Sequence, residues 1–267
     1  MSAENFSHAE RAKFIRDQIP AGGLFAGMNW RISPEPFSLG ENLAKEIESL
    51  GRVLLQFYRA VNLLYRKSVE GKEPEWVSRW LDLGKPRELI EFQRSTAFKN
   101  DFPRVIRPDI LLTENGFSIT ELDSVPGGIG LTAWLNQIYS KSETRNPKSE
   151  IIGGADGMIR GFESILGGAK NVHVVVSDEA ATYKPEMEWL AKQMRNTECG
   201  VRNSEFSDFN EGDAVYRFFE LFDLPNVANA KKIFELAAGK KIKLTPPPKP
   251  IFEEKMLFAL LWNRNLQ

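Results

Sequence analysis

Four charged side chains in one short stretch have the types and spacing that phosphate and magnesium chemistry needs. Arg107 and Asp109 precede a turn-forming sequence at residues 114–116, and Glu121 and Asp123 follow it. Apolar and β-branched residues on both sides of the turn predict a β-hairpin. An arginine can hold a phosphate through two parallel hydrogen bonds, and Mg²⁺ takes carboxylate oxygens together with phosphate oxygens and water. The chemistry therefore depends on whether the hairpin brings the four side chains onto one face.

The length of the hairpin loop decides this, because side chains alternate between the two faces of a strand. A two-residue Asn-Gly turn would pair Glu114 with Phe117 and would split the charged residues between the faces. A three-residue loop with Gly116 in the left-handed region would pair Thr113 with Phe117 and would bring all four onto one face. We predict the three-residue loop.

In that register Arg107 faces Asp123, and Asp109 faces Glu121. Two carboxylates directly opposite on a sheet repel each other by a few tenths to ~1 kcal/mol unless a cation lies between them. Magnesium would reverse the sign of this interaction. The alternative is a solvated hairpin face with one Arg-Asp ion pair. Spacing alone leaves both interpretations open.

A glycine-rich loop follows the hairpin. Gly127, Gly128 and Gly130 lie just before a predicted helix. Backbone amides at a helix N-terminus can approach an anion, and the helix dipole there is positive. A phosphate would fit this position. Glycines that only permit a tight turn are the alternative.

The sequence Arg107-Pro-Asp109 followed by Glu121-Leu-Asp123-Ser124 and a downstream Gly-Gly resembles the Arg-x-Asp and Glu-x-Asn pair of circularly permuted ATP-grasp enzymes. These include glutathionylspermidine synthetase-like and eukaryotic glutathione synthetase-like ligases. The resemblance implies that Arg107 contacts the transferred phosphoryl group and that Ser124 lies near the acyl substrate. It also implies that Asp109, Glu121 and Asp123 bind Mg²⁺. Asp123 departs from the family's asparagine and adds a negative charge.

The resemblance covers only the N-terminal portion of such enzymes. It implies an inserted α/β substrate domain and a helix led by Lys255. Lys255 would then contact the nucleotide, with a solvent-facing lysine as the alternative. The relatives continue for a hundred or more residues beyond this helix, with the adenine pocket and a glycine-rich lid. We therefore expect residues 251–267 to begin a truncated nucleotide-binding segment, and the chain alone to bind Mg-ATP weakly or not at all and not to hydrolyse it.

The implied activity is that of an ATP-dependent ligase, which joins a small-molecule or peptide carboxylate to an amine through an acyl phosphate. ATP and Mg²⁺ are the expected cofactors, and a separately encoded C-terminal half is a possible partner. The alternative is a non-catalytic binding or scaffold protein derived from that fold, or one subunit of a split ligase. The genomic reading frame downstream of the chain would discriminate between these.

Hydrophobic periodicity predicts an α/β protein with two main parts. A front domain, residues 1–165, has helices at 7–18, at 38–71 with Ser38 as its cap, and at 76–98 with breaks at Gly84 and Pro86. A small parallel α/β unit, residues 166–250, has strands at 171–177 and 214–219, a helix at 185–195 and a polyproline connection at 245–250. A last helix spans 252–262. Residues at or just beyond these strand ends are candidate substrate contacts: Asp178, Tyr183, Lys184 and Arg217.

Composition excludes several classes of protein. The 267 residues have a net charge of -1 and no stripe dense in lysine and arginine, so nothing favours nucleic acid or an anionic membrane as the partner. The single cysteine, Cys199, allows no intrachain disulfide and fits a reducing compartment. The first 16 residues lack the apolar centre of a signal peptide, and no stretch reaches the ~20 apolar residues of a spanning helix. We therefore expect a cytoplasmic protein.

Overall fold

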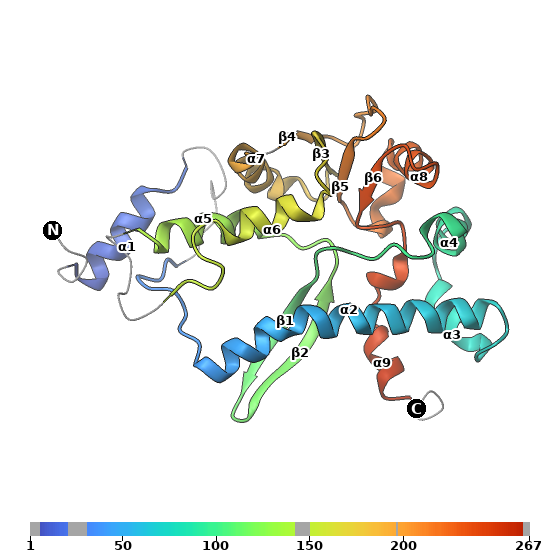
Figure 1. Cartoon of the computed structure of the whole chain (residues 1–267), viewed down its shortest axis with the longest axis horizontal. Coiled ribbons are helices and arrows are strands. Elements are labelled where there is room, and N and C mark those ends of the chain that lie inside the picture. Colours follow the sequence, from blue (N-terminus) through green and yellow to red (C-terminus); the bar gives the residue numbers. More distant parts are fainter. Residues whose placement is uncertain (1–5, 21–30, 142–149, 196, 264–267) are drawn as a thin grey trace.

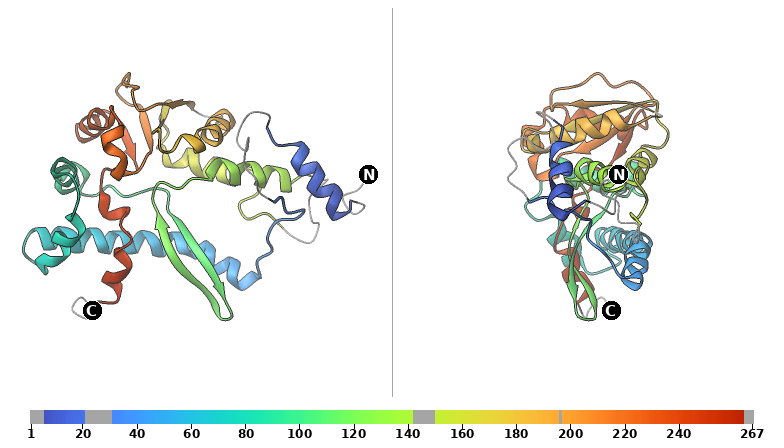
Figure 2. Two further views of the ribbon diagram at one scale, coloured as in Figure 1. Left: turned by 180° about the vertical axis from the view of Figure 1, so that it is seen from behind. Right: turned by 90° about the vertical axis from the view of Figure 1, so that its left-hand side faces the viewer.

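The computed structural model describes residues 6–20, 31–141, 150–195 and 197–263. It shows a mixed α/β protein with a two-stranded antiparallel hairpin and a four-stranded parallel sheet. The end of the hairpin that is joined to the rest of the chain lies near the parallel sheet, and its turn points away (Figure 1). The views from behind and from the side also show the turn of the hairpin pointing away from the parallel sheet (Figure 2). The coarse α/β prediction is therefore confirmed.

The parallel sheet consists of β3 (Asn171–Val176), β4 (Glu198–Arg202), β5 (Ala214–Phe218) and β6 (Lys243–Thr245), in the order β4-β3-β5-β6. The two central strands are buried along nearly their whole length. A continuous apolar run such as Val174, Val175 and Val176 is typical of a parallel strand that is covered on both faces.

Helices connect these strands in both directions from the centre of the sheet. α7 (Lys184–Gln193) leads from β3 outward to β4, and α8 (Ala230–Ala238) leads from β5 outward to β6. The strand order therefore reverses between β3 and β5. In open α/β sheets the crevice outside the carboxyl ends of the strands at such a reversal is the usual place for a ligand.

Two cores cover the two faces of the sheet. On one face, α5 (Ile129–Tyr139) and α6 (Gly157–Ile165) pack with α7 against Val172, Val174 and Tyr216. On the other face, α4 (Arg87–Arg94) packs with α8 against Val175 and Val215. Helices from the predicted front domain thus complete the cores of the α/β unit, so the cores extend across the predicted boundary at residue 165.

A third core forms around the second half of α2 (Glu41–Val69). Tyr58, Val61 and Tyr65 pack there against α3 (Glu75–Asp82) and the C-terminal part of the chain. The backbone of Gly40 caps α2, so the predicted cap at Ser38 is wrong. The predicted break at Gly84 and Pro86 is confirmed, because α3 ends before it and α4 begins after it. The remaining short elements are α1 (His8–Asp17), η2 (Thr96–Phe98), η3 (Ala181–Tyr183), η4 (Leu221–Asn226), η5 (Pro250–Phe252) and α9 (Leu257–Leu261).

One prediction for the C-terminal part needs correction. The predicted helix 252–262 is only the short α9, preceded by the 3-10 turn η5. The proline-rich segment 245–250, predicted as a polyproline connection, is buried along its whole length. Its lysine, Lys249, lies beneath aromatic rings of the third core. Among the described residues, no helix is long and apolar enough to cross a membrane.

Candidate functional site

The hairpin brings the four predicted residues together, by a route that differs from the predicted one. β1 (Arg107–Thr113) and β2 (Gly116–Asp123) are joined by a two-residue turn, in which Thr113 pairs with Gly116. The predicted three-residue loop is therefore wrong. A register shift beyond Asp109 leaves Thr120 without a paired residue, and such a β-bulge restores the parity of the side chains.

Beyond the bulge the register is the predicted one, with Arg107 opposite Asp123 and Asp109 opposite Glu121. The guanidinium of Arg107 joins both aspartates, with Nε 3.1 Å from Asp109 Oδ1 and Nη2 3.1 Å from Asp123 Oδ2. Its Nη1 donates to the carbonyl of Gly127 at 3.2 Å. The arginine thus connects both strands of the hairpin to the glycine-rich loop.

Lys255 supplies the second cation of this cluster. Its Nζ lies 2.9 Å from Glu121 Oε1, although the two residues are far apart in sequence. This hydrogen bond and the charge of Glu121 raise the pKa of Lys255. The predicted cation between the opposed carboxylates is therefore supplied in part by a lysine of the chain itself.

A cavity of about 240 Å³ lies beside this cluster, at the carboxyl ends of β3 and β5. Arg107 and Asp123 line it from the hairpin. The segments that follow the two strands line the opposite side. Their contributions are Ser177, Glu179, Ala180, Tyr183, Phe218, Phe219, Glu220 and Asp223. The cavity therefore lies at the point where the strand order reverses, where this sheet type binds ligands.

The cavity has an acidic lining, with Arg107 as its one cation among the described lining residues. Burial raises the pKa of Asp123, against the opposing effects of the Val125 N–H and Arg107. Burial, followed by the adjacent carboxylate of Glu253, raises the pKa of Glu220 to about 8. Asp223 is buried, and its Oδ2 has no hydrogen-bond partner among the described residues. A buried carboxylate oxygen of this kind favours a cationic ligand, because an unpaired buried acceptor is costly.

Arg217, a predicted substrate contact, is instead part of the support beneath the cavity. It is fully buried and forms an ion pair with Glu253. Its other donors contact the carbonyls of Phe219, Pro246 and Pro247. Glu253 also accepts from the N–H of Leu221 at 2.8 Å. Arg217 therefore holds the end of β5 to the proline-rich segment and presents no donor to the cavity.

The predicted phosphate position at the N-terminus of α5 is filled by a carboxylate of the chain. Gly128 N and Leu131 N donate to Glu186 Oε1 and Oε2 at 2.5 and 3.0 Å. Glu186 is buried, which raises its pKa, and these N–H groups oppose that effect. The reasoning that an anion belongs at this helix end is sound, but the anion comes from α7.

The glycines of this loop have a packing explanation. A Cβ on Gly127 would lie 2.5 Å from the ring of Tyr183, and a Cβ on Gly130 would lie 2.2 Å from the carbonyl oxygen of Glu186. Gly128 has φ +85°, which glycine adopts at low cost. The loop therefore needs glycines to let α5 approach α7.

Ser124 is buried and takes part in an internal hydrogen-bond network. Its hydroxyl donates to the carbonyl of Phe252 at 2.8 Å and lies 3.2 Å from the hydroxyl of Tyr58. Burial raises the pKa of Tyr58 to about 12. Ser124 thus joins the end of the hairpin to α2 and η5, and it faces these groups rather than the cavity.

Of the three remaining substrate candidates, one lines the cavity and two do not. Tyr183 lines the cavity, with its ring edge-on to Phe218 at 5.9 Å. Asp178 is exposed, and Lys184 is half-buried at the start of α7; neither lines the cavity. Sequence reasoning missed Glu179, Glu220 and Asp223. Their positions just after β3 and β5 are the signal that would have found them.

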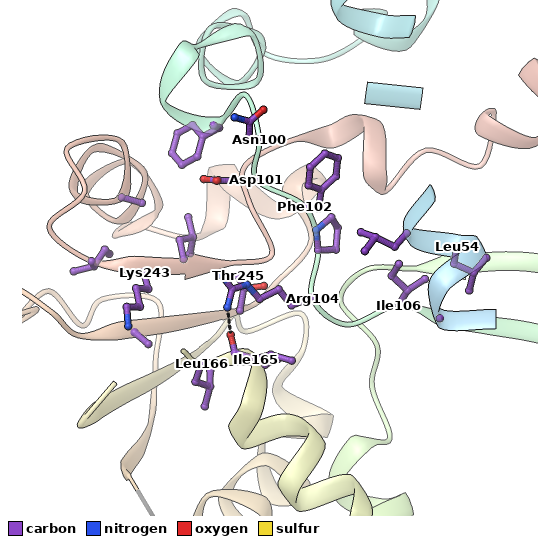
Figure 3. Close-up of a pocket in the computed structure, with 18 of the residues that line it drawn as sticks. Leu54, Asn100, Asp101, Phe102, Arg104, Ile106, Ile165, Leu166, Lys243 and Thr245 are labelled. Atoms are coloured by element: carbon purple, nitrogen blue, oxygen red, sulfur yellow. Dashed lines mark hydrogen bonds between the residues drawn. The ribbon is translucent and has the colours of Figure 1, made fainter. Parts of the chain in front are cut away.

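A larger cavity, of about 820 Å³, lies elsewhere, between α2, residues 98–108 and the β6 edge of the sheet (Figure 3). Its charged groups are engaged with neighbours. Arg104 donates to the Ile165 carbonyl at 3.1 Å, Lys243 donates to the Gly167 carbonyl at 2.6 Å, and Asp101 pairs with Lys240 at 3.6 Å. We place the candidate site at the smaller cavity, because it combines unpaired acidic groups with the strand-order reversal.

The donor chemistry of the hairpin face suits Mg²⁺, since it offers carboxylate oxygens of Asp109, Glu121 and Asp123. In the described part of the chain, however, no group of three acidic, histidine or cysteine side chains is already arranged to hold a metal ion. Arg107 and Lys255 hold the carboxylates instead. A scan against protein-family models found no match to this chain, and a search of curated proteins found no relative.

Proposed function

We propose that the chain forms one wall of an ATP-dependent carboxylate–amine ligase site of the circularly permuted ATP-grasp type, located in the cytoplasm. The observation that carries the proposal is the register that sets Arg107 opposite Asp123 and Asp109 opposite Glu121 beside a cavity at the strand-order reversal. In such a ligase, ATP phosphorylates a carboxylate, and an amine displaces phosphate from the acyl phosphate. Catalysis of this kind depends on positioning and on neutralising charge.

The side chains divide these tasks between them. Arg107 would hold the transferred phosphoryl group, for which its planar guanidinium is suited. Asp109, Glu121 and Asp123 would hold Mg²⁺, which supplies charge neutralisation to phosphate oxygens when bound. Glu179 and Asp223 would attract the positively charged amine substrate to the cavity. Lys255 would leave Glu121 for the nucleotide phosphates, which offer it a more highly charged partner.

A non-catalytic binding or scaffold protein is the second candidate, and two observations favour it. Glu186 fills the anion position at the N-terminus of α5, and Lys255 is paired to Glu121. Both contacts reduce the need for external phosphate and metal. One subunit of a split ligase would reconcile the two candidates, since a second chain could draw Lys255 toward the nucleotide.

Thermal unfolding with and without Mg²⁺ or Mn²⁺ tests the metal-binding part of the proposal. A ligand that binds only the folded state at tenfold excess over Kd adds about 1.4 kcal/mol of stability, which is a rise of a few degrees for a chain of this size. We expect this rise in the wild type and its loss in Glu121→Gln. Glu114→Gln is the matched control, because it removes the same charge from the turn of the same hairpin.

An ATP-dependent ligation assay against panels of acids and amines decides between the candidates. Amide formation that requires ATP and is abolished by Arg107→Gln would support the ligase. A Mg²⁺ response without amide formation, with or without an added second chain, would support the binding protein. A Mg²⁺ response that survives in Glu121→Gln would contradict the metal assignment.

A further inference from the structure

A second polar cavity, of about 440 Å³, lies on α2 and has the opposite charge. Arg59, Asn62, Leu63 and Arg66 line it from the helix, and Lys99, Asn100 and Phe102 line it from the segment that follows η2. Three of these described lining residues are cations, and none is a carboxylate. Several positive charges at one concave surface raise the local concentration of anions.

These three cations have no counter-ion within the described part of the chain. Arg59, Arg66 and Lys99 form no ion pair with a described carboxylate, whereas Lys67 and Lys72, which follow Arg66 in the sequence, pair with Glu73 and Glu70. The charges of Arg66 and Lys99 contribute to the lowered pKa of Glu70, but the main cause is the hydrogen bond from Lys72. The positive charge of the cavity is therefore left without compensation.

Two buried polar atoms of the lining residues are also without a partner among the described residues. They are Nε of Arg66 and Oδ1 of Asn62, a residue that is 7% exposed. Asn62 is held in place by its Nδ2, which donates to the Lys99 carbonyl at 3.2 Å. A buried donor or acceptor without a partner is costly, and a ligand with anionic oxygens and a hydroxyl group would offer an acceptor to the first atom and a donor to the second.

The floor beneath the cavity adds further positive charge. Lys249 is buried, with Nζ donating to the carbonyls of Phe98 and Asp101 at 3.2 and 3.0 Å and lying 5.3 Å from the centre of the Phe102 ring. Burial, followed by the charge of Arg66, lowers the pKa of Lys249 to about 7. An anion beside Arg66 would offset the charge of Arg66 and would favour the charged lysine.

We propose that this cavity binds a small phosphorylated metabolite, with Arg59, Arg66 and Lys99 holding its phosphate group. Phosphate fits better than a monocarboxylate, because its two charges and several acceptor oxygens can satisfy three cations at once. Leu63 and Phe102 give the cavity an apolar wall against which the organic part of the ligand packs. The volume falls within the range of small-molecule sites.

This site is distinct from the ligase site and does not depend on it. Its lining residues share no member with the cavity at the strand ends. The two are connected through the chain, since Lys249 beneath the basic cavity is followed closely by Glu253, the partner of Arg217 beneath the acidic one.

Calorimetric titration of the full chain with inorganic phosphate and with a phosphate monoester such as glycerol 3-phosphate tests the proposal, at constant ionic strength and without divalent cations. We expect saturable binding, tighter for the monoester than for inorganic phosphate, and at least tenfold weaker in Arg59→Gln and in Lys99→Gln. Acetate should bind more weakly than either phosphate ligand.

Arg52→Gln is the matched control, because it removes the same charge from an exposed position of the same helix outside the cavity. We expect it, and Arg107→Gln at the other site, to change the affinity by less than twofold. No binding by the wild type would overturn the proposal, as would equal weakening by Arg52→Gln and Arg59→Gln, or loss of binding only in Arg107→Gln. Melting temperatures without ligand verify that each variant is folded.

Discussion

The acidic cavity at the strand ends and the basic cavity on α2 have lining charges of opposite sign, and they differ in whether the chain itself compensates those charges. At the acidic cavity, carboxylates from distant segments lie close together. Arg107 and Arg217 form ion pairs with carboxylates of this region. In the basic cavity, Arg59 and Arg66 come from one helix, and no carboxylate lines the cavity among the described residues. A charge cluster that the chain itself compensates can be structural, whereas one left uncompensated calls for an outside ligand.

The comparison also distinguishes the parts of the acidic region. The hairpin face has its own cations, Arg107 and Lys255, while Asp223 within the cavity keeps an unpaired buried oxygen. The need for an external cation is therefore greatest inside the cavity and smaller on the hairpin face. The predictions below break these charge arrangements one at a time, from the largest expected effect to the smallest.

Replacing Arg217 should cause the largest loss. Arg217→Met leaves Glu253 buried beside Glu220 without its cation, and breaking a buried ion pair from one side costs about 3–5 kcal/mol. Urea unfolding should show this loss, and the double variant Arg217→Met with Glu253→Leu should recover a large part of it. A loss below about 1 kcal/mol in the single variant would mean that the pair does not hold the floor of the cavity.

The pH dependence of stability should have opposite signs in the two regions. Glu220 has a pKa of about 8, above its ordinary value, so its contribution is present at pH 4 and is lost as the pH rises toward 8. Lys249 has a pKa of about 7, below its ordinary value, so its contribution is present above pH 10.5 and is lost as the pH falls toward 7. Each group changes the free energy of unfolding by at most about 1.4 kcal/mol per pH unit.

Comparing each single variant with the wild type distinguishes the contributions of Glu220 and Lys249 from each other and from those of other groups. We expect Glu220→Gln to remove a fall in stability between pH 5 and 8, and Lys249→Met to remove a rise between pH 7 and 10. The free energy of unfolding, measured by urea titration at each pH, gives both slopes. Wild-type slopes that persist in the two variants would show that other groups titrate in these ranges.

The sequence predicted the residues of the hairpin face better than the way in which they converge. Alternation along β1 and β2 and the identity of Arg107 were enough to propose the site, but the bulge at Thr120 has no local sequence signal. The carboxylate of Glu186 reaches α5 from another helix, so no local pattern could show that the helix N-terminus is already filled. Long-range contacts of this kind decide whether a predicted anion site is free.

The same limitation explains the missed elements. β6 has three residues and β4 has five, which is too short for periodicity to identify, and the helix α8 was also missed. Prolines 246–248 predicted a stiff connection, and composition alone could not show that this segment is buried. The strand β3 was found because a valine-rich run is visible without tertiary information, and β5 was found because apolar residues flank Arg217 on both sides.

The smallest effect on stability should come from Lys255, and it tests the hairpin face most directly. Lys255 is 75% exposed at the side chain, so its ion pair with Glu121 is screened by solvent, and Lys255→Gln should leave the metal-free melting temperature nearly unchanged. The same change removes the cation that competes with a metal for Glu121. If Glu121 is a ligand for Mg²⁺, the variant should therefore show a larger Mg²⁺-induced rise in melting temperature than the wild type, and Glu121→Gln added to it should abolish that gain. A rise equal to that of the wild type would indicate that the metal binds away from Glu121, and a large loss of stability without metal would indicate that Lys255 holds the hairpin to the rest of the fold.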